Sequence, residues 1–284
     1  MSRLHSQTIL LFIAVIFMAS CAVVPVKRIT KVPVAKGSVP ANPLQKAGWQ
    51  LTFHDEFNNS ILDRNKWNTR FYWSDGTEHH GRYMPENPKE YYRDDFFEFT
   101  DSTIKLKSDT LKMKVHAREI KYSCSMIDCS KSFEQQYGYF EIRSRNPTSP
   151  GFWPAFWLVS TYSWPPEIDM YEFYTSRPRQ WTNTVHYLNN SKHEMEGRIY
   201  RMPDASAGFH IYAVEWNEKE VKFFLDNQLV RTTSTGINTF TFPMHIIINI
   251  AMENPHSKKT KMKKATFPNY LEVDYVRTYR KLLP

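Results

Sequence analysis

The sequence predicts an all-β protein, built as a β-sandwich of two antiparallel sheets. Short segments in which apolar and polar residues alternate, the pattern of a half-buried strand, recur at residues 49–53, 103–107 and 111–115. Turn-forming residues separate such segments, as Asp101 and Ser102 do just before 103–107. No sustained helical period follows the N-terminal segment. Many short strands with turns between them are typical of a sandwich and not of an α/β fold.

The N-terminal segment predicts export. Arg3 precedes an apolar run at residues 9–18, and the small residues Ala19 and Ser20 lead to Cys21. This order is that of a signal peptide, and the run is too short to span a membrane comfortably. It resembles a bacterial lipoprotein signal, in which Cys21 becomes the lipidated first residue. A plain secretory signal and an uncleaved anchor are the alternatives.

The domain organisation follows from these features. We expect residues 1–20 to be a lipoprotein-type signal peptide, and the mature protein to be an outer-membrane or cell-surface lipoprotein, otherwise periplasmic or secreted. Residues 21–46 are rich in Val, Pro, Lys and Ala without periodicity, which predicts a linker that tethers the protein. Residues 47–284 form one predicted globular domain, a usual size for a single sandwich.

The charge balance is basic, with 37 Lys and Arg against 29 Asp and Glu. A positive surface attracts anionic partners, and five lysines between Lys258 and Lys264 are the densest group. No helical basic stripe or nucleic-acid-binding motif is present, so we expect no nucleic acid partner. The lysine group is either a solvated loop or a contact for an anionic polymer.

Three carboxylates stand close together in the stretch 166–174, among strand-forming apolar and aromatic residues. Side chains alternate between the faces of a strand, so Glu167 and Asp169 share one face and Glu172 falls on the other. One extra residue, a β-bulge between Asp169 and Glu172, brings all three to one face, and bulges are common beside active sites. The alternative is a solvated acidic strand face, against which Ile168 and the aromatic neighbours argue.

This arrangement suits a retaining glycosidase. The outer two carboxylates have Cα atoms roughly 13 Å apart at about 3.3 Å per residue. On a concave sheet, glutamate side chains that lean together approach the ~5 to 5.5 Å separation that double displacement uses. Glu167 is then the predicted nucleophile and Glu172 the general acid and base, with Asp169 tuning their charges.

The surrounding residues carry a resemblance. Gly151-Phe-Trp-Pro-Ala-Phe-Trp-Leu158, then Trp164-Pro-Pro and Glu167-Ile-Asp-Met-Tyr-Glu172, resemble glycoside hydrolase family sixteen, in the branch with the Glu-x-Asp-x-x-Glu motif. The resemblance runs from about Trp49 to Tyr279. It implies a jelly-roll β-sandwich with a concave substrate cleft and retaining endo-hydrolysis of a β-linked polysaccharide, a β-1,3-glucan or a marine galactan. Transglycosylation on similar glycans and a non-catalytic carbohydrate-binding lipoprotein are the alternatives. We expect a monomer that contacts a membrane only through its lipid anchor.

Four residues are candidate sugar contacts. Trp153 and Trp157 share one strand face, and we place it in the cleft because indoles stack on pyranose rings; the alternative puts both in the core. By resemblance, Trp164 stands where a sugar platform is expected. His186 lies on the expected next strand, facing the carboxylates, where it orients an acid or binds a sugar hydroxyl; a satisfied core histidine is the alternative.

Two further predictions concern stability. With Cys21 lipidated, Cys124 and Cys129 remain as an even pair, which in an exported protein favours a short-loop disulfide over free thiols. The resemblance also implies a possible structural calcium ion bound through Glu56 and Asp274, with backbone and water completing its shell. We expect that catalysis requires no cofactor.

Overall fold

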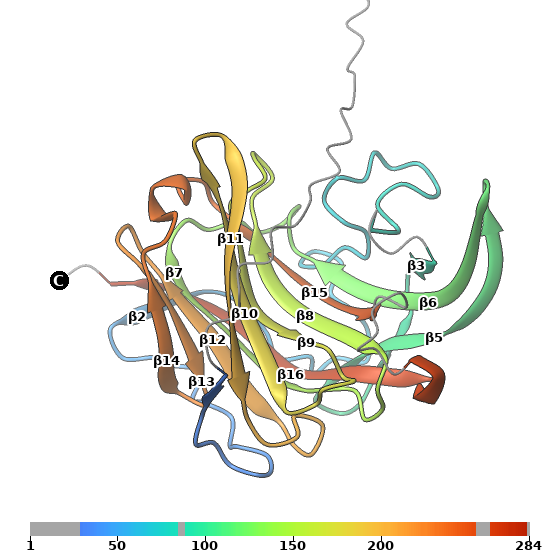
Figure 1. Cartoon of the computed structure of the whole chain (residues 1–284), viewed down its shortest axis with the longest axis horizontal. Coiled ribbons are helices and arrows are strands. Elements are labelled where there is room, and N and C mark those ends of the chain that lie inside the picture. Colours follow the sequence, from blue (N-terminus) through green and yellow to red (C-terminus); the bar gives the residue numbers. More distant parts are fainter. Residues whose placement is uncertain (1–28, 85–88, 254–261, 283–284) are drawn as a thin grey trace, which may run out of the picture.

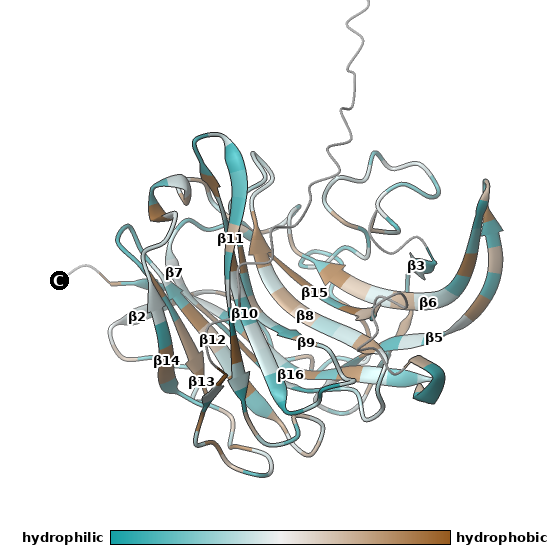
Figure 2. Cartoon of the chain, in the orientation of Figure 1, coloured by the Kyte–Doolittle hydropathy of each residue, from teal (hydrophilic) through white to brown (hydrophobic). Residues whose placement is uncertain are grey.

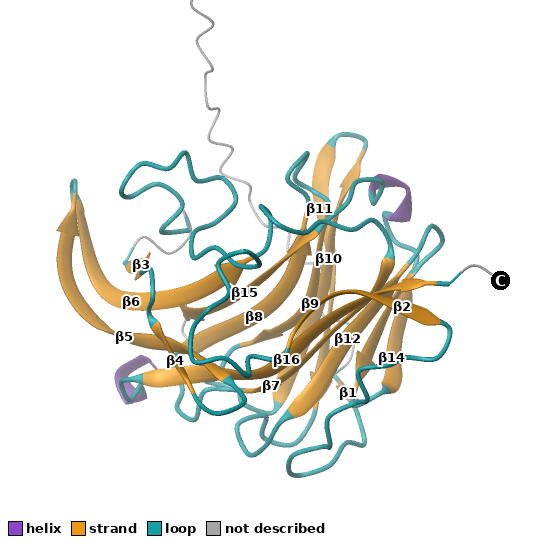
Figure 3. Cartoon of the chain, turned by 180° about the vertical axis from the view of Figure 1, so that it is seen from behind, coloured by secondary structure: helices purple, strands orange, loops and turns teal. Residues whose placement is uncertain are grey.

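The computed structural model describes residues 29–84, 89–253 and 262–282. It consists of strands and connecting loops, and within these ranges the only helices are two short 3-10 turns, η1 (Ile237–Thr239) and η2 (Met262–Lys264). Figure 3 shows how completely strands dominate the chain. The prediction of an all-β protein is confirmed. In the part of the chain that the structure describes, no helix is long and apolar enough to cross a membrane.

The strands form two layers, which we call the front sheet and the back sheet (Figure 1). The front sheet has the order β1 (Thr30–Lys31), β11 (Lys192–Arg201), β10 (Gln180–Asn189), β9 (Glu167–Phe173), β8 (Phe152–Val159), β15 (His245–Met252) and β6 (Arg118–Asp128). The back sheet has the order β14 (Gln228–Thr233), β13 (Val221–Leu225), β12 (His210–Trp216), β7 (Gly138–Arg145), β16 (Asn269–Lys281) and β5 (Ile104–Val115).

Three strands lie off this path, and the two sheets are continuous. β2 (Trp49–Asp55) pairs with β16, β4 (Phe97–Phe99) with β5, and β3 (Glu90–Tyr92) with β6. β5 also pairs with β6, so the front and back sheets join through one long hairpin, which curves away from the body in Figure 1. Most pairs are antiparallel, as predicted, but β1–β11 and β3–β6 are parallel.

The core lies between the two sheets. Tyr171 of β9 packs on Tyr212 of β12, with ring centroids 4.6 Å apart, and so joins the front sheet to the back sheet. All eight residues of β15 are buried, which fits the largely apolar sequence of this strand. Along β5 polar and apolar residues alternate, visible as bands in Figure 2. Such alternation predicts a strand because apolar side chains lie on its buried face and polar side chains on its exposed face.

The prediction of a free linker up to residue 46 is wrong for its described part. β1 adds a parallel strand to β11, and Val32, only 5% exposed, belongs to the core. Further along, Val39 donates its backbone N–H to the Phe209 carbonyl at 2.8 Å. The globular unit therefore begins near Thr30, before residue 47. The predicted signal peptide and Cys21 lie outside the described residues.

The predicted disulfide is also wrong, because Cys124 and Cys129 are both free, buried thiols. Cys124 lies within β6 and Cys129 follows its last residue. Five extended residues at about 3.3 Å each separate two Cα atoms by roughly 16 Å. A disulfide requires about 4.4 to 6.8 Å. Burial raises the pKa of both thiols well above the usual range, which keeps them protonated.

The residues predicted to hold calcium do not fit that ion. Both carboxylate oxygens of Glu56 accept hydrogen bonds from Arg277, at 2.9 and 2.7 Å. Asp274 accepts one from Arg143 at 2.6 Å. Partial burial raises the pKa of Glu56, but the Arg277 contacts outweigh it and hold that pKa below its usual value. Each carboxylate is already paired with a guanidinium, whose positive charge offsets the negative charge that would attract a divalent cation.

Candidate active site

The three carboxylates lie on one face of β9 because the strand carries the predicted bulge. On the neighbouring strand β8, Ala155, Trp157 and Val159 pair with Glu172, Asp169 and Glu167. These partners are alternate residues, so they share a face, and the acids opposite them share it too. On the other side, β10 pairs with β9 with its register shifted between Thr182 and Thr184.

The bulge places two consecutive side chains in the core. Met170 and Tyr171, between the acids, are both fully buried. A bulge leaves a residue outside the ladder, and an unpaired buried carbonyl is costly. Here the indole N–H of Trp181, itself fully buried, donates to the Met170 carbonyl at 3.2 Å. This hydrogen bond gives the Met170 carbonyl a partner from β10.

The acid face opens into a cavity of about 730 Å³. All seven residues predicted for catalysis and substrate binding line it, namely Glu167, Asp169, Glu172, Trp153, Trp157, Trp164 and His186. Residues that were not predicted complete the lining, among them Tyr72, Trp73, Met84, Tyr174, Thr184, His193 and Asn249. Polar groups therefore converge at one point of a largely aromatic cleft, which is typical of a small-molecule or sugar site.

Two tryptophans hold the two glutamates. The Trp164 indole N–H donates to Glu167 Oε2 at 2.7 Å, and that of Trp153 donates to Glu172 Oε1 at 3.1 Å. The Thr184 hydroxyl donates to the other oxygen of Glu172 at 3.3 Å. Each glutamate is thus fixed by a donor from a different element, and the two carboxyls are not interchangeable.

A histidine pair holds the middle acid. His186 Nε2 lies 3.0 Å from Asp169 Oδ2 and 3.7 Å from Glu167 Oε1. The other ring nitrogen of His186 contacts His193 Nε2 at 2.9 Å, and the two rings stack with planes 12° apart. His193 was not predicted. It belongs to β11, and its seven-residue spacing from His186 across the β10–β11 turn was the available signal.

Burial dominates the electrostatics of the acids. It raises the pKa of Glu167 to about 8, with a further contribution from the Asp169 charge, against which His186 and the Trp164 N–H act. Burial and then the Glu172 charge raise the pKa of Asp169 well above its usual value. Burial raises that of Glu172 too, with Glu167 adding to the effect and His186 opposing it. Near neutral pH the cleft therefore holds fewer than three negative charges.

Comparison with known proteins decides the family. The model of glycosyl hydrolases family 16 matches residues 89–277, which include every acid of the cleft. The chain belongs to this family. It is 28% identical over 241 residues to the endo-1,3-1,4-beta-glycanase EglC of Rhizobium meliloti, covering 80% of this chain and 51% of that protein. It is 36% identical over 164 residues to a beta-glucanase of Rhodothermus marinus, covering 51% of this chain and 57% of that protein.

Solved family 16 structures have the same fold. The laminarinase catalytic domain of Thermotoga maritima MSB8 superposes with a TM-score of 0.70 at 26% identity, over 83% of this chain and 99% of that domain. LamAcat of Zobellia galactanivorans superposes with a TM-score of 0.69 at 25% identity, over 81% of this chain and 97% of that chain. The predicted jelly-roll sandwich is therefore confirmed. The chain spans about half the length of the first curated relatives that it matches.

The tryptophans of this family 16 cleft differ in exposure. Trp164 is 51% exposed and presents an open face. Trp153 is half-buried and stacks on Tyr174, with centroids 5.3 Å apart. Trp157 is only 6% exposed and donates its indole N–H to Asn249 at 2.9 Å, so it forms part of the cleft floor and belongs also to the core.

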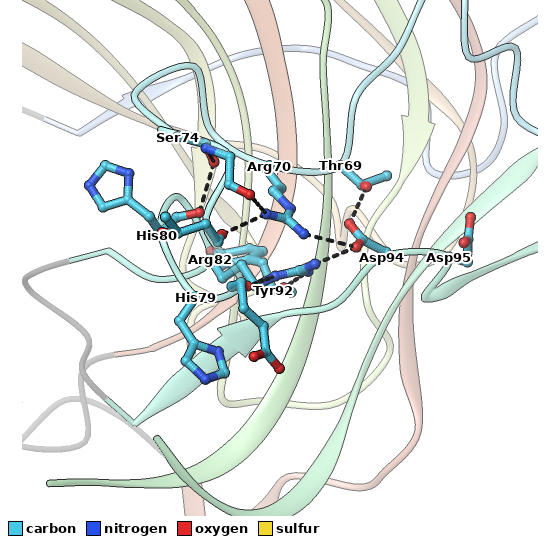
Figure 4. A network of polar contacts seen from close by, with 12 residues as sticks. Thr69, Arg70, Ser74, His79, His80, Arg82, Tyr92, Asp94 and Asp95 are labelled. Carbon is cyan, nitrogen blue, oxygen red and sulfur yellow. Dashed lines mark hydrogen bonds and ion pairs between the residues drawn. The ribbon is translucent and has the colours of Figure 1, made fainter. Parts of the chain in front are cut away.

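A loop between residues 69 and 84 supplies one wall of the family 16 cleft through Tyr72, Trp73 and Met84. Figure 4 shows the polar network that fixes this loop. Arg82 and Arg70 both pair with Asp94, and the Thr69 hydroxyl donates to the same carboxylate at 2.6 Å. In the lysine-rich stretch, Lys263 and Lys264 lie in η2, while Lys258, Lys259 and Lys261 fall outside the described residues.

Proposed function

We propose that the protein is an endo-acting, retaining glycoside hydrolase that cleaves β-linked polysaccharide by double displacement. The observation that carries this proposal is the set of three acids on one face of the bulged strand β9, inside an aromatic-lined cleft. A module that only binds sugar needs the aromatic residues but not three crowded carboxyls, whose repulsion is costly.

In the first step Glu167 attacks the anomeric carbon, and the bond to the leaving oxygen breaks. Glu172 donates its proton to that oxygen, and a covalent glycosyl-enzyme remains. The raised pKa of Glu172 supports its role as the acid. The attack requires ionised Glu167. Burial and the Asp169 charge oppose ionisation and raise its pKa to about 8, while the Trp164 N–H and His186 limit that rise.

In the second step Glu172 removes a proton from water, and the resulting oxygen attacks the anomeric carbon and releases Glu167. Asp169 lies between the two glutamates along β9 and bonds to His186, so its role is to position and tune the pair. The same two steps with a sugar hydroxyl in place of water give transglycosylation, which is an outcome to be tested.

For the substrate we propose β-1,3-glucan or mixed-linkage β-1,3-1,4-glucan. The relatives named above are a glycanase of that linkage and a beta-glucanase, and the structural neighbours include a laminarinase. A galactan remains the second candidate, because a galactan endo-beta-1,3-galactanase of Flammulina velutipes is 33% identical over 113 residues.

The test is the release of reducing ends from laminarin, mixed-linkage glucan, agar, porphyran and carrageenan. Glu167→Gln is expected to abolish release. Glu172→Ala is expected to lose activity that azide partly restores, because azide attacks the glycosyl-enzyme without a general base. NMR of the first product should show retained anomeric configuration.

Four results contradict parts of the proposal. Wild-type turnover by Glu167→Gln overturns the nucleophile, and an inverted first product overturns double displacement. Products longer than the starting oligosaccharide, without new reducing ends, identify a transglycosylase. Binding without either reaction identifies a carbohydrate-binding protein.

A further inference from the structure

Exposed aromatic side chains gather beside the cleft. Among the residues that the structure describes, the aromatic side chains most open to solvent are Tyr162, Trp164 and Phe242, at 66%, 51% and 40% exposure. Tyr162 and Phe242 stack on each other, with centroids 5.8 Å apart and planes 15° apart. They come from neighbouring loops, since Val159 at the end of β8 pairs with His245 at the start of β15.

A short segment, residues 134–136, ties the two loops together. The Thr161 hydroxyl donates to Glu134 Oε1 at 2.6 Å, beside Tyr162. The side-chain amide of Gln136 donates to the Thr241 carbonyl at 2.7 Å, beside Phe242. The two rings are therefore held in place before any ligand arrives, which lowers the entropic cost of binding on them.

The stacked pair lies near the cleft, because Tyr162 is two residues from Trp164. Trp164 belongs to the same loop as Tyr162, lines the cavity and donates to Glu167. An exposed apolar surface next to a site usually marks a ligand contact. A stable protein interface buries about 800 Å² per partner, far more than two aromatic rings provide. A ligand that already occupies the cleft fits this surface better.

We propose that Tyr162 and Phe242 form a second sugar-binding site, the rim site, for a pyranose ring of the same polysaccharide outside the catalytic cleft. This proposal rests on the proposed function. The flat faces of the two stacked rings cover the apolar face of a sugar. A long chain reaches the rim site and the cleft together, whereas a short oligosaccharide occupies only the cleft.

The test compares polymer with oligomer. The double variant Tyr162→Ala, Phe242→Ala should raise KM for laminarin about fivefold, the order expected for the loss of aromatic contacts, and leave kcat unchanged. Its KM for laminaritetraose should not change. If another polysaccharide of the panel is the better substrate, that polymer and its tetrasaccharide replace these two.

Matched variants separate binding from folding. Tyr162→Phe and Phe242→Tyr keep the flat faces and should behave nearly as wild type. Leu229→Ala changes a side chain that is 54% exposed on β14 of the back sheet and should affect neither substrate. Equal thermal unfolding of all variants shows that the fold is intact.

Two outcomes overturn the rim site without touching the proposed function. One is an active wild type whose laminarin KM equals that of the double variant. The other is a KM that rises equally for tetraose and polymer, which places the rings in the cleft. Retardation of the protein in a laminarin gel needs no turnover, so equal retardation of wild type and double variant overturns the rim site even where no hydrolysis is found.

Discussion

Replacing Asp169 by Asn should move the acidic limb of the pH–rate profile to lower pH. Oxygens of Asp169 and Glu167 lie within 4.8 Å of each other. At that distance and an effective dielectric constant of ~20, two charges repel by about 3.5 kcal/mol, equivalent to roughly 2.5 pKa units. Burial and this charge raise the pKa of Glu167 to about 8. Removing the charge therefore lets the nucleophile ionise at lower pH.

The expected change is a fall of the acidic limb of kcat/KM by up to about 2 pH units, since kcat/KM reports the free enzyme. The assay follows reducing-end release between pH 4 and 9. Asn has the shape of Asp and still contacts His186. Asp226→Asn is the matched control, because Asp226 also pairs with a histidine, at 2.8 Å, but in the back sheet. An unmoved limb in Asp169→Asn would show that Asp169 is uncharged when Glu167 titrates, and would refute this reasoning.

Three further predictions address the cleft wall, acid stability and anchoring. Asp94→Ala should raise KM with little change in kcat. It releases Arg70 and Arg82 and so loosens the loop that carries Tyr72 and Trp73. Asp95→Ala is the control, because it breaks only the exposed pair with Arg64. Burial lowers the pKa of His245 to about 3, so as pH falls below about 6.5 the unfolded chain takes up a proton that the folded chain does not. The free energy of unfolding should therefore fall by about 2 kcal/mol at pH 5. Urea unfolding at pH 7 and pH 5 should show this loss in the wild type but not in His245→Asn. An equal loss in both proteins would contradict the prediction. We also propose that Cys21 is lipidated. Detergent phase separation should then find the wild type in the detergent phase and Cys21→Ser in the aqueous phase. Unchanged partitioning would count against a lipid anchor.

The acid motif could be read from the sequence because its information is local. Strand alternation fixes the faces of Glu167 and Asp169, and one extra residue is the simplest way to bring Glu172 to the same face. The structure contains that bulge. Trp153 and Trp164 were found for the same reason, since each lies within the hairpin formed by β8 and β9. A site built on consecutive strands leaves its pattern in one stretch of sequence.

Some of the residues that were missed come from distant parts of the chain. Tyr72 and Trp73 reach the cleft from a loop whose position depends on ion pairs with Asp94, and Asn249 reaches it from β15. No local period predicts such contacts. The failed linker prediction has a different cause, because β1 is attached mainly by backbone hydrogen bonds at a sheet edge, and these require no particular side chains. Val32 and the partly buried Val34 carry the apolar signal.

The predicted disulfide is wrong because two residues that are close in sequence need not be close in space. Five residues apart, Cys124 and Cys129 would be close in a turn, but they lie along an extended strand. For the acids, the extended conformation was part of the prediction. The proposed mechanism needs Glu167 and Glu172 to be separated along the strand, so that a sugar fits between them. Conformation decides what a spacing means, and the strand pattern around both motifs was the evidence available for it.

The bulge also explains how one strand serves the core and the cleft at once. Its extra residue lets Met170 and Tyr171 both face inward, so the core loses no apolar contact where the acids turn outward. The cost of the broken ladder is limited by the Trp181 N–H on the Met170 carbonyl. The acid spacing on which the proposed double displacement depends is therefore maintained by buried residues that do not line the cavity. Variation at the exposed rim, at Tyr162 or Phe242, can then alter substrate binding while the positions of the three acids stay fixed.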